Sequence, residues 1–283
     1  MKKLSFTLLI LVLCFAVFAQ PAVEKKETVN ELRIVSLAPN VTEILCALGC
    51  ESSLVGRTDY CDYPESVTSV PSIGTLYEPN LEAILALEPD VAIASSIVDP
   101  DFIASLEKAG VKAYQFLEEY NGLEGTYALI REVGEAAGKT KEAEELALNV
   151  KKRIEAVTAL TSGVEKKSCI YIISWGDWGD YAATGDTYLN EVIKAAGAEN
   201  AAEEALYWSI SREFLLDKDP SYIILPTYAY TDPSQFENFR NTSPYSQLSG
   251  QLITIDGNAA ERQGVRSADT VEAIAKALYP ELF

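Results

Sequence analysis

The sequence predicts an α/β protein made of two similar lobes, with mainly parallel sheets and one long helix between the lobes. Apolar, strand-like runs alternate with helical patterns on both sides of a central helical stretch, as is typical of parallel βαβ units. The central stretch, residues 139–160, is the longest helical pattern without glycine or proline. A short pattern also recurs once in each half, which indicates that the two lobes share an architecture.

The first lobe is expected over residues 32–138. Its opening run LRIVSLA, residues 32–38, is typical of a buried strand, and Asn40 with Glu43 three residues later forms a capping box for the next helix. Further strands are expected at 54–58, 90–96 and 112–117, and helices at 80–87, 101–109 and 125–137.

A single helix over residues 139–161 is expected to join the lobes. Leu146, Val150, Ile154 and Val157 recur at the spacing of one helical face, so this helix presents an apolar stripe. The alternation of strands and helices then restarts, and the second lobe is expected over residues 162–283. Its strands are predicted at 168–174, 221–227 and 251–255, and its helices at 187–196, 211–218 and 268–279.

The repeated pattern covers residues 80–93 (NLEAILALEPDVAI) and 211–224 (SREFLLDKDPSYII). Each copy begins with a helix-capping residue, continues with a glutamate two residues later, and ends with an acid–proline pair before an apolar strand. The glutamates are Glu82 and Glu213. A carboxylate in the first turn of a helix stabilises it by about 0.3–1 kcal/mol and needs no other role. Two such glutamates on equivalent surfaces of the two lobes would also suit a partner protein with two basic binding sites.

The amino terminus has the pattern of a secretory signal. Two lysines precede an apolar run over residues 4–18 that is too short for a stable membrane span, and cleavage is expected after Ala19. Residues 1–19 therefore predict export to the periplasm or the outer face of the cytoplasmic membrane, and residues 20–31 predict a flexible segment. A lipoprotein anchored through Cys14 is the disfavoured alternative, because Leu13 stands where a small residue is wanted.

Composition excludes several classes of function. The 283 residues carry 23 basic and 42 acidic side chains, a net charge of −19, and such a chain repels nucleic-acid phosphates. Without histidine it can form neither a Ser-His-Asp relay nor an imidazole zinc site, so no catalytic residue, cofactor or metal site is assigned. The remaining cysteines are interpreted as buried thiols, although an exported protein could oxidise them: Cys46, Cys50, Cys61 and Cys169.

Large aromatic residues gather in loops between the expected strands and helices, and the loops that follow parallel strands are where such sheets bind ligands. Rigid rings suit a large, flat or partly apolar ligand, and packing against the core is the alternative for each ring. In the loop ERQGVR, Arg262 and Arg266 can grip an anionic group or form salt bridges on the acidic surface. The aromatic candidates are Tyr60, Tyr77, Trp175, Trp178, Tyr181, Tyr207 and Trp208.

Five segments together resemble a known family: RIVSLAPNVTEILCALG, RTDYCDYP, IGTLYEPNLEAILALEPDVAIA, YWSISREFLLDKDPSYIIL and ERQGVR…ALYPELF. Over residues 32–283 the chain resembles the Fe/B12-type solute-binding proteins of ABC importers, which include vitamin B12, ferric-siderophore and haem binders. The resemblance implies the class III fold, with two Rossmann-like lobes joined by a rigid interdomain helix. It also implies a monomer whose Glu82 and Glu213 meet arginines of a membrane permease that works with an ATPase.

The resemblance implies a metal chelate as the ligand: a ferric siderophore, haem or a corrinoid. Ring contacts to vitamin B12 would correspond to Tyr60, Trp175 and Tyr207, but Leu76 stands where that binder has a pocket tryptophan. For haem, Tyr77 is the attractive axial ligand in a chain without histidine. The two arginines of the loop ERQGVR would suit anionic ferric chelates.

Two other functions compete with an import receptor. A surface sensor or adhesin could use the same scaffold without transport. A secreted glycosidase needs two carboxylates within about 5–10 Å across one cleft, whereas Glu82 and Glu213 are expected on separate lobes. The import receptor is therefore the preferred interpretation.

Overall fold

The computed structural model describes residues 32–95, 97–117 and 122–283, which belong to one compact unit. The expected signal at 1–19, the segment 20–31 and Cys14 lie outside the described residues. Among the helices of the described part, none has the length and apolarity needed to cross a bilayer.

The first lobe is built on a four-stranded parallel sheet in the order β2-β1-β3-β4. Its two central strands are buried throughout, as expected for a parallel sheet covered on both faces. The strands are β1 (Ile34–Ser36), β2 (Leu54–Arg57), β3 (Val91–Ala94) and β4 (Lys112–Gln115), and the helices are α1 (Pro39–Ala47), α2 (Leu81–Ala86), α3 (Pro100–Lys108) and α4 (Gly122–Ala136).

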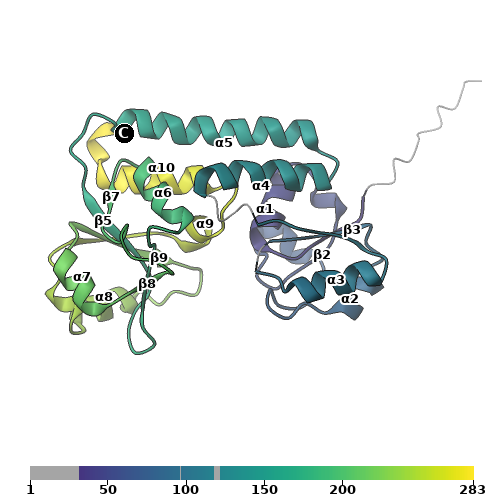
Figure 1. Ribbon diagram of the computed structural model, residues 1–283, viewed down its shortest axis with the longest axis horizontal. Coiled ribbons are helices and arrows are strands. Elements are labelled where there is room, and N and C mark those ends of the chain that lie inside the picture. The colour runs from purple at the N-terminus through teal and green to yellow at the C-terminus, as the bar shows by residue number, and fades with distance from the viewer. Residues whose placement is uncertain (1–31, 96, 118–121) are drawn as a thin grey trace, which may run out of the picture. The chain divides into compact units, whose positions relative to one another are not determined.

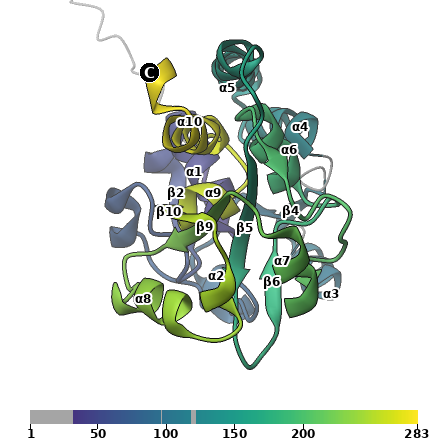
Figure 2. The same ribbon diagram turned by 90° about the vertical axis from the view of Figure 1, so that its left-hand side faces the viewer.

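The second lobe is built on a six-stranded sheet in which β10, β9 and β5 are parallel, while β6 and β8 are antiparallel. The strands are β5 (Ser168–Ser174), β6 (Asp180–Ala182), β7 (Glu199–Asn200), β8 (Ser209–Ile210), β9 (Tyr222–Thr227) and β10 (Gln251–Asp256). The helices are α6 (Tyr188–Ala195), α7 (Arg212–Lys218), α8 (Ser234–Asn241), α9 (Gly257–Glu261) and α10 (Ser267–Leu278). Helices α6 and α10 lie towards α5, whereas α7 and α8 lie on the side away from it (Figures 1 and 2).

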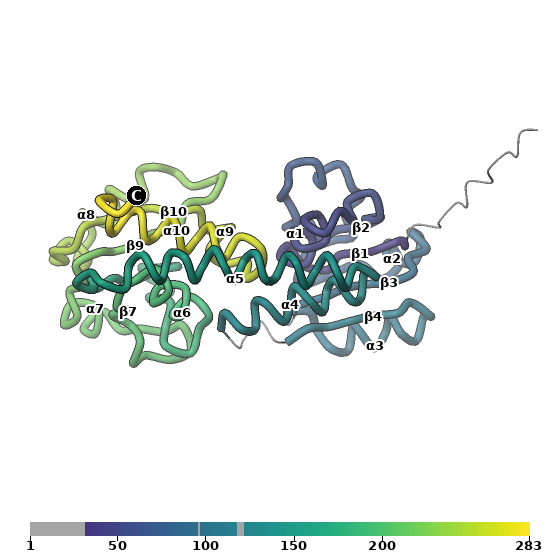
Figure 3. The backbone as a smooth tube through the Cα atoms, turned by 90° about the horizontal axis from the view of Figure 1, so that it is seen from above, coloured from purple at the N-terminus to yellow at the C-terminus, as the bar shows by residue number. Residues whose placement is uncertain are grey.

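Helix α5 (Thr140–Thr161) runs past both sheets and packs on α4 and α10 (Figures 1 and 3). Val150, Ile154 and Val157 of the expected stripe are buried, and Ala143 lies so close to α4 that a Cβ at Gly134 would stand 2.1 Å from its Cβ. The expected class, two α/β lobes with mainly parallel sheets and a long connecting helix, is confirmed. The lobe boundaries at 138 and 162 stay predictions.

The repeated pattern forms the same local structure in both lobes. In each copy a side chain caps a short helix: Asn80 accepts from the Ala83 N–H and Ser211 from the Phe214 N–H, both at 3.0 Å. Each helix leads to a parallel strand, β3 or β9. The acids of the two acid–proline pairs also share a left-handed backbone, with φ of 46° at Glu88 and 31° at Asp219.

The capping box predicted for the first helix is wrong. Helix α1 is capped at Ala38, without a side-chain cap, and Pro39 takes the first helical position. The Glu43 carboxylate is instead bound by arginines of the second lobe. Spacing alone does not distinguish a glutamate that caps a helix from one that binds arginines of the other lobe, because a glutamate three residues after Asn40 is compatible with both roles.

Candidate ligand-binding cleft

A pocket of about 380 Å³, called the cleft pocket below, is lined by residues of both lobes. Its size falls in the range of small-molecule sites, about 300–1,000 Å³. The lining that matters for binding consists of Tyr60, Leu76 and Ile97 from the first lobe and Asp186, Trp208, Glu261 and Arg262 from the second.

The first-lobe wall is mostly apolar and aromatic, with Asn40 and Ser95 as its polar residues. Tyr60 follows the carboxyl end of β2, and its ring meets that of Tyr77 edge to face at 6.2 Å between centroids. Tyr77 is 70% exposed, while the adjacent Leu76 is buried and lines the pocket. This wall therefore offers a ring and aliphatic surface to a ligand, with Tyr77 next to it.

The second-lobe wall depends on a strained turn. Tyr207 and Trp208 both have φ of 61°, a left-handed conformation that bulky residues rarely adopt. The Tyr207 N–H donates to an Asp186 carboxylate oxygen at 2.9 Å, and the Trp208 N–H donates to the Thr184 hydroxyl at 3.0 Å. These two bonds hold the turn, so Asp186 fixes the segment that brings Trp208 to the cleft pocket.

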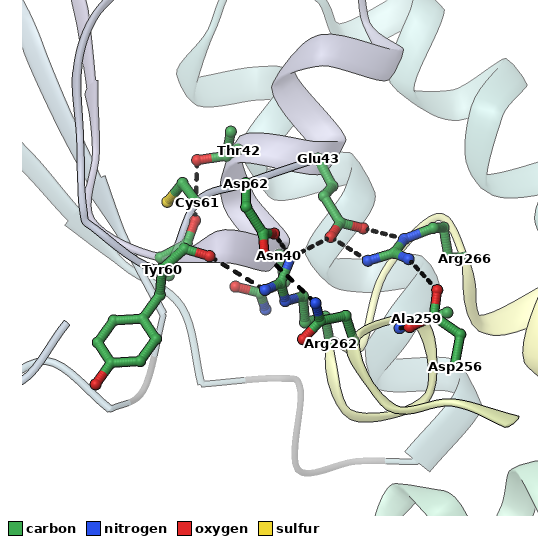
Figure 4. Close-up of polar contacts among 12 residues, drawn as sticks. Asn40, Thr42, Glu43, Tyr60, Cys61, Asp62, Asp256, Ala259, Arg262 and Arg266 are labelled. Atoms are coloured by element: carbon green, nitrogen blue, oxygen red, sulfur yellow. Dashed lines mark hydrogen bonds and ion pairs between the residues drawn. The ribbon is translucent and has the colours of Figure 1, made fainter. Parts of the chain in front are cut away.

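The floor between the lobes is an ionic cluster, called the Glu43 cluster and formed by Glu43, Asp62, Asp256, Arg262 and Arg266 (Figure 4). Arg266 binds Glu43 through both Nε and Nη2, at 2.7 and 2.5 Å. Arg262 reaches across to Asp62 at 2.5 Å and to Glu43 at 3.1 Å, and donates to the Tyr60 carbonyl oxygen. The cluster therefore fastens the second lobe to helix α1 and to the loop that carries Tyr60.

Both arginines of this cluster are committed to carboxylates. Burial opposes the charge of Arg262, but its bonds to Asp62 and Glu43 outweigh this, so its pKa is raised. Burial also opposes the charge of Arg266, but its bonds to Glu43 outweigh this, so its pKa is raised as well. Arg266 lies outside the cleft-pocket lining. This differs from the expectation of two guanidinium groups open to an anionic ligand and matches the alternative of salt bridges.

Glu261 is the second carboxylate of the cleft pocket. One of its oxygens accepts from the hydroxyls of Tyr171, at 2.9 Å, and Tyr228, at 2.6 Å. Burial raises the pKa of Glu261, while the two tyrosines and Arg262 act in the other direction. In return, burial and the nearby carboxylate raise the pKa of both tyrosines, which therefore stay protonated donors.

The other aromatic candidates lie outside the cleft-pocket lining. Trp175 packs edge-on against Phe239 and Tyr245 and lines a separate pocket of about 450 Å³ at the ends of β5 and β9. Trp178, Tyr181 and Tyr207 are 92%, 41% and 80% exposed. Tyr60 and Trp208 are thus the predicted rings that line the cleft pocket, with Tyr77 in contact with Tyr60.

Glu82 and Glu213 occupy equivalent places in the two copies of the repeat. Each lies in the first turn of its helix, α2 or α7, and is exposed. Neither carboxylate takes part in an ion pair among the described residues. The two side chains are therefore free to meet a partner.

Sequence reasoning missed several residues that shape the cleft pocket. Asp62 lies in the segment RTDYCDYP and Glu261 in the segment ERQGVR. In these segments the sequence analysis selected the aromatic residues and the arginines as candidates, but not the two acids. Asp186 gave no signal, because its role is to bind the backbone of a turn twenty-one residues away. Gln263, which bonds to the Gly122 carbonyl and the Thr126 hydroxyl, likewise acts through a distant contact.

Within the described part, none of the four cysteines is joined to another by a disulfide, and three of them are buried. Burial raises the pKa of Cys46 and of Cys169 to about 12, which keeps both protonated and unreactive at neutral pH. Within residues 32–95, 97–117 and 122–283, no group of acidic or cysteine side chains is arranged to hold a metal ion.

Comparison with known proteins identifies the family of this chain. The periplasmic binding protein family matches residues 34–243, most of the described chain, so the protein belongs to that family. An ABC transporter substrate-binding lipoprotein of Bacillus subtilis, YvrC, is 27% identical over 261 residues, covering 89% of this chain and 81% of the relative. A vitamin B12-binding protein of Vibrio campbellii is 26% identical over 215 residues, 75% of this chain and 77% of its own.

Solved structures show the same fold. The periplasmic haem-binding protein HutB of Vibrio cholerae superposes with a TM-score of 0.80, over 88% of this chain and all of that one, at 24% identity. At that identity the likeness concerns the fold alone. It establishes the class III arrangement of two lobes and a connecting helix.

Proposed function

We propose that this protein is the extracytoplasmic substrate-binding component of an ABC importer, which captures a metal chelate between its lobes and delivers it to a membrane permease. The cleft pocket carries the proposal, because rings from both lobes, Tyr60 and Trp208, line one small-molecule site. The names of the relatives support a ferric siderophore, haem or a corrinoid as the ligand class. The ligand is bound without being transformed, and an enzyme or an adhesin is not favoured by the family.

Binding would involve only modest closure of the lobes. They are joined by the continuous helix α5 and by the Glu43 cluster, and neither can act as a flexible hinge. The walls of the cleft pocket are therefore largely preformed, which limits the ordering cost of capturing a ligand.

Glu82 and Glu213 would dock the loaded protein onto the permease. Both are exposed and lack an ion-pair partner among the described residues, so two basic sockets on the permease could pair with them at little desolvation cost within this protein. The partner ATPase would then drive release.

Tryptophan fluorescence tests the ligand class. Titration with a corrinoid, a ferric trihydroxamate, a ferric tricatecholate and haem is expected to quench emission and raise the melting temperature with at least one probe. Trp208→Phe should remove most of the quenching. Trp178→Phe should leave it unchanged, because Trp178 is 92% exposed and outside the lining. A panel that changes neither signal would refute the proposal.

Charge reversal tests the docking role. Glu82→Lys combined with Glu213→Lys is expected to abolish stimulation of the importer's ATPase while leaving ligand affinity within about twofold. The exposed Glu155→Lys on α5 is the matched control. A drop in affinity in the double variant would place the two glutamates at the ligand instead.

A further inference from the structure

The cleft pocket is lined by the carboxylates of Asp186 and Glu261, and the nearby charge of Arg262 acts to lower the pKa of Glu261. Asp186 accepts hydrogen bonds from the Thr184 hydroxyl and the Tyr207 N–H, and Glu261 accepts from two tyrosine hydroxyls. Neither forms an ion pair within the described residues. Both line the pocket that the proposed function assigns to the ligand.

The cations near the pocket are already neutralised. Arg262 is the one basic residue in the described lining, and its side chain is 13% exposed, with Asp62 and Glu43 within 3.1 Å. Arg266 is shared between Glu43 and Asp256. The two arginines are thus paired with three carboxylates, Glu43, Asp62 and Asp256, and form no salt bridge with Asp186 or Glu261 among the described residues.

We infer that the cleft selects metal chelates that are neutral or positively charged and discriminates against anionic ones. The inference rests on the proposed function and adds the charge of the ligand to it. Asp186 and Glu261 are both exposed and both line the pocket. A ligand that displaces water from the pocket would therefore meet their charges through a lower dielectric than that of water, which penalises a like charge on the ligand. The net charge of −19 extends the same bias to the approach of the ligand.

Chelate chemistry separates the candidates by charge. Three hydroxamates neutralise Fe³⁺, so the charge of a ferric trihydroxamate is that of its side arm. Three catecholates leave the ferric complex strongly anionic, and haem carries two propionates. A corrinoid with amide side arms lacks such carboxylates. The pocket therefore favours hydroxamate chelates and amide corrinoids over catecholates and haem.

A matched series of probes tests this order. A linear ferric trihydroxamate with an ammonium arm is compared with its acetylated, neutral form and its succinylated, anionic form. An amide corrinoid is compared with its monocarboxylate derivative, and ferric tricatecholate and haem complete the set. In each matched series we expect the anionic member to bind at least tenfold more weakly in fluorescence titrations. The difference should shrink when salt is raised from about 0.01 to about 1 M, where the Debye length falls from about 30 to about 3 Å.

The outcomes separate this inference from the proposed function. Tightest binding of the succinylated probe, the tricatecholate or haem overturns the charge preference and leaves chelate capture standing. Binding of no probe at all overturns the proposed function. Equal affinity within a matched series also contradicts the inference.

Two variants locate the selectivity. Glu261→Gln keeps an oxygen to accept from Tyr171 and Tyr228, and Asp186→Asn keeps one for the Tyr207 N–H, so each removes charge while preserving these bonds. For each variant, the affinity for the ammonium probe divided by the affinity for the succinylated probe is expected to fall at least threefold. The control Glu155→Gln, on the exposed face of α5, should leave the ratio unchanged. An unchanged ratio in both pocket variants, with melting temperatures near that of the unmodified protein, would show that these carboxylates do not select charge.

Discussion

The two lobes share one helix–strand unit and differ in what they offer to the cleft. Residues 80–94 and 211–227 repeat the capping side chain, the exposed glutamate, the left-handed acid before proline and the parallel strand. At the cleft, however, the first lobe contributes neutral rings and aliphatic groups, while the second contributes Asp186, Glu261 and a strained aromatic turn. We propose that the shared unit docks to one partner and that the loops that differ select the ligand.

The largest expected effect comes from breaking the junction between the lobes. Glu43→Ala removes the main partner of the buried Arg266 and one of the two carboxylates bound by Arg262, which is expected to cost about 3–5 kcal/mol of unfolding free energy. Denaturant unfolding measures it. Asp62→Ala is the control, because this carboxylate is about half exposed and its removal should cost far less. Equal losses in the two variants would contradict the central place of Glu43.

This junction also shows where sequence reasoning stops. The strands, the long helix, the repeat and its caps follow from local periodicity and turn chemistry, and these predictions were confirmed. The Glu43 cluster joins residues about two hundred positions apart, and no local pattern reports such a pairing. Short elements such as β6, β7 and β8 escaped for another reason, because two or three residues are too few to show a period.

A smaller effect is expected where α5 meets the first lobe. Gly134→Ala would place a methyl group against Ala143 at a distance that no packed pair adopts, so α4 and α5 must separate. We expect a loss of about 1–3 kcal/mol, the usual cost of overpacking. Ala143→Gly in the same chain should recover part of it. Thermal unfolding of the single and double variants checks this coupling.

The caps of the repeated unit test the equivalence of the lobes. Asn80→Ala and Ser211→Ala each remove an acceptor from the first turn of a short helix, and each should cost about 1 kcal/mol. Hydrogen exchange in α2 and α7 should increase only in the lobe that carries the change. Strongly unequal losses would show that one copy has taken on an additional structural role.

The smallest expected effect concerns Asp219, one of the two acids that have a left-handed backbone before a proline. In the second lobe, hydrogen bonds from the Ser249 hydroxyl and N–H lower the pKa of Asp219 below its usual 3.8. The stabilisation is therefore present above that value and is lost as the pH falls through the lowered pKa. Asp219→Asn should flatten the acid limb of the stability profile slightly. The profile is obtained from melting temperatures between pH 2 and pH 6, and identical acid limbs would contradict the effect.

The central claim is that one chelate is held by both lobes at once. It is tested most directly by measuring chelate affinity for Tyr60→Ala and Trp208→Ala, one ring from each wall of the cleft pocket. Each change is predicted to weaken binding at least tenfold, or about 1.4 kcal/mol, while Trp178→Ala leaves the affinity unchanged. Loss in only one of the two variants, or in neither, would contradict a ligand shared between the lobes.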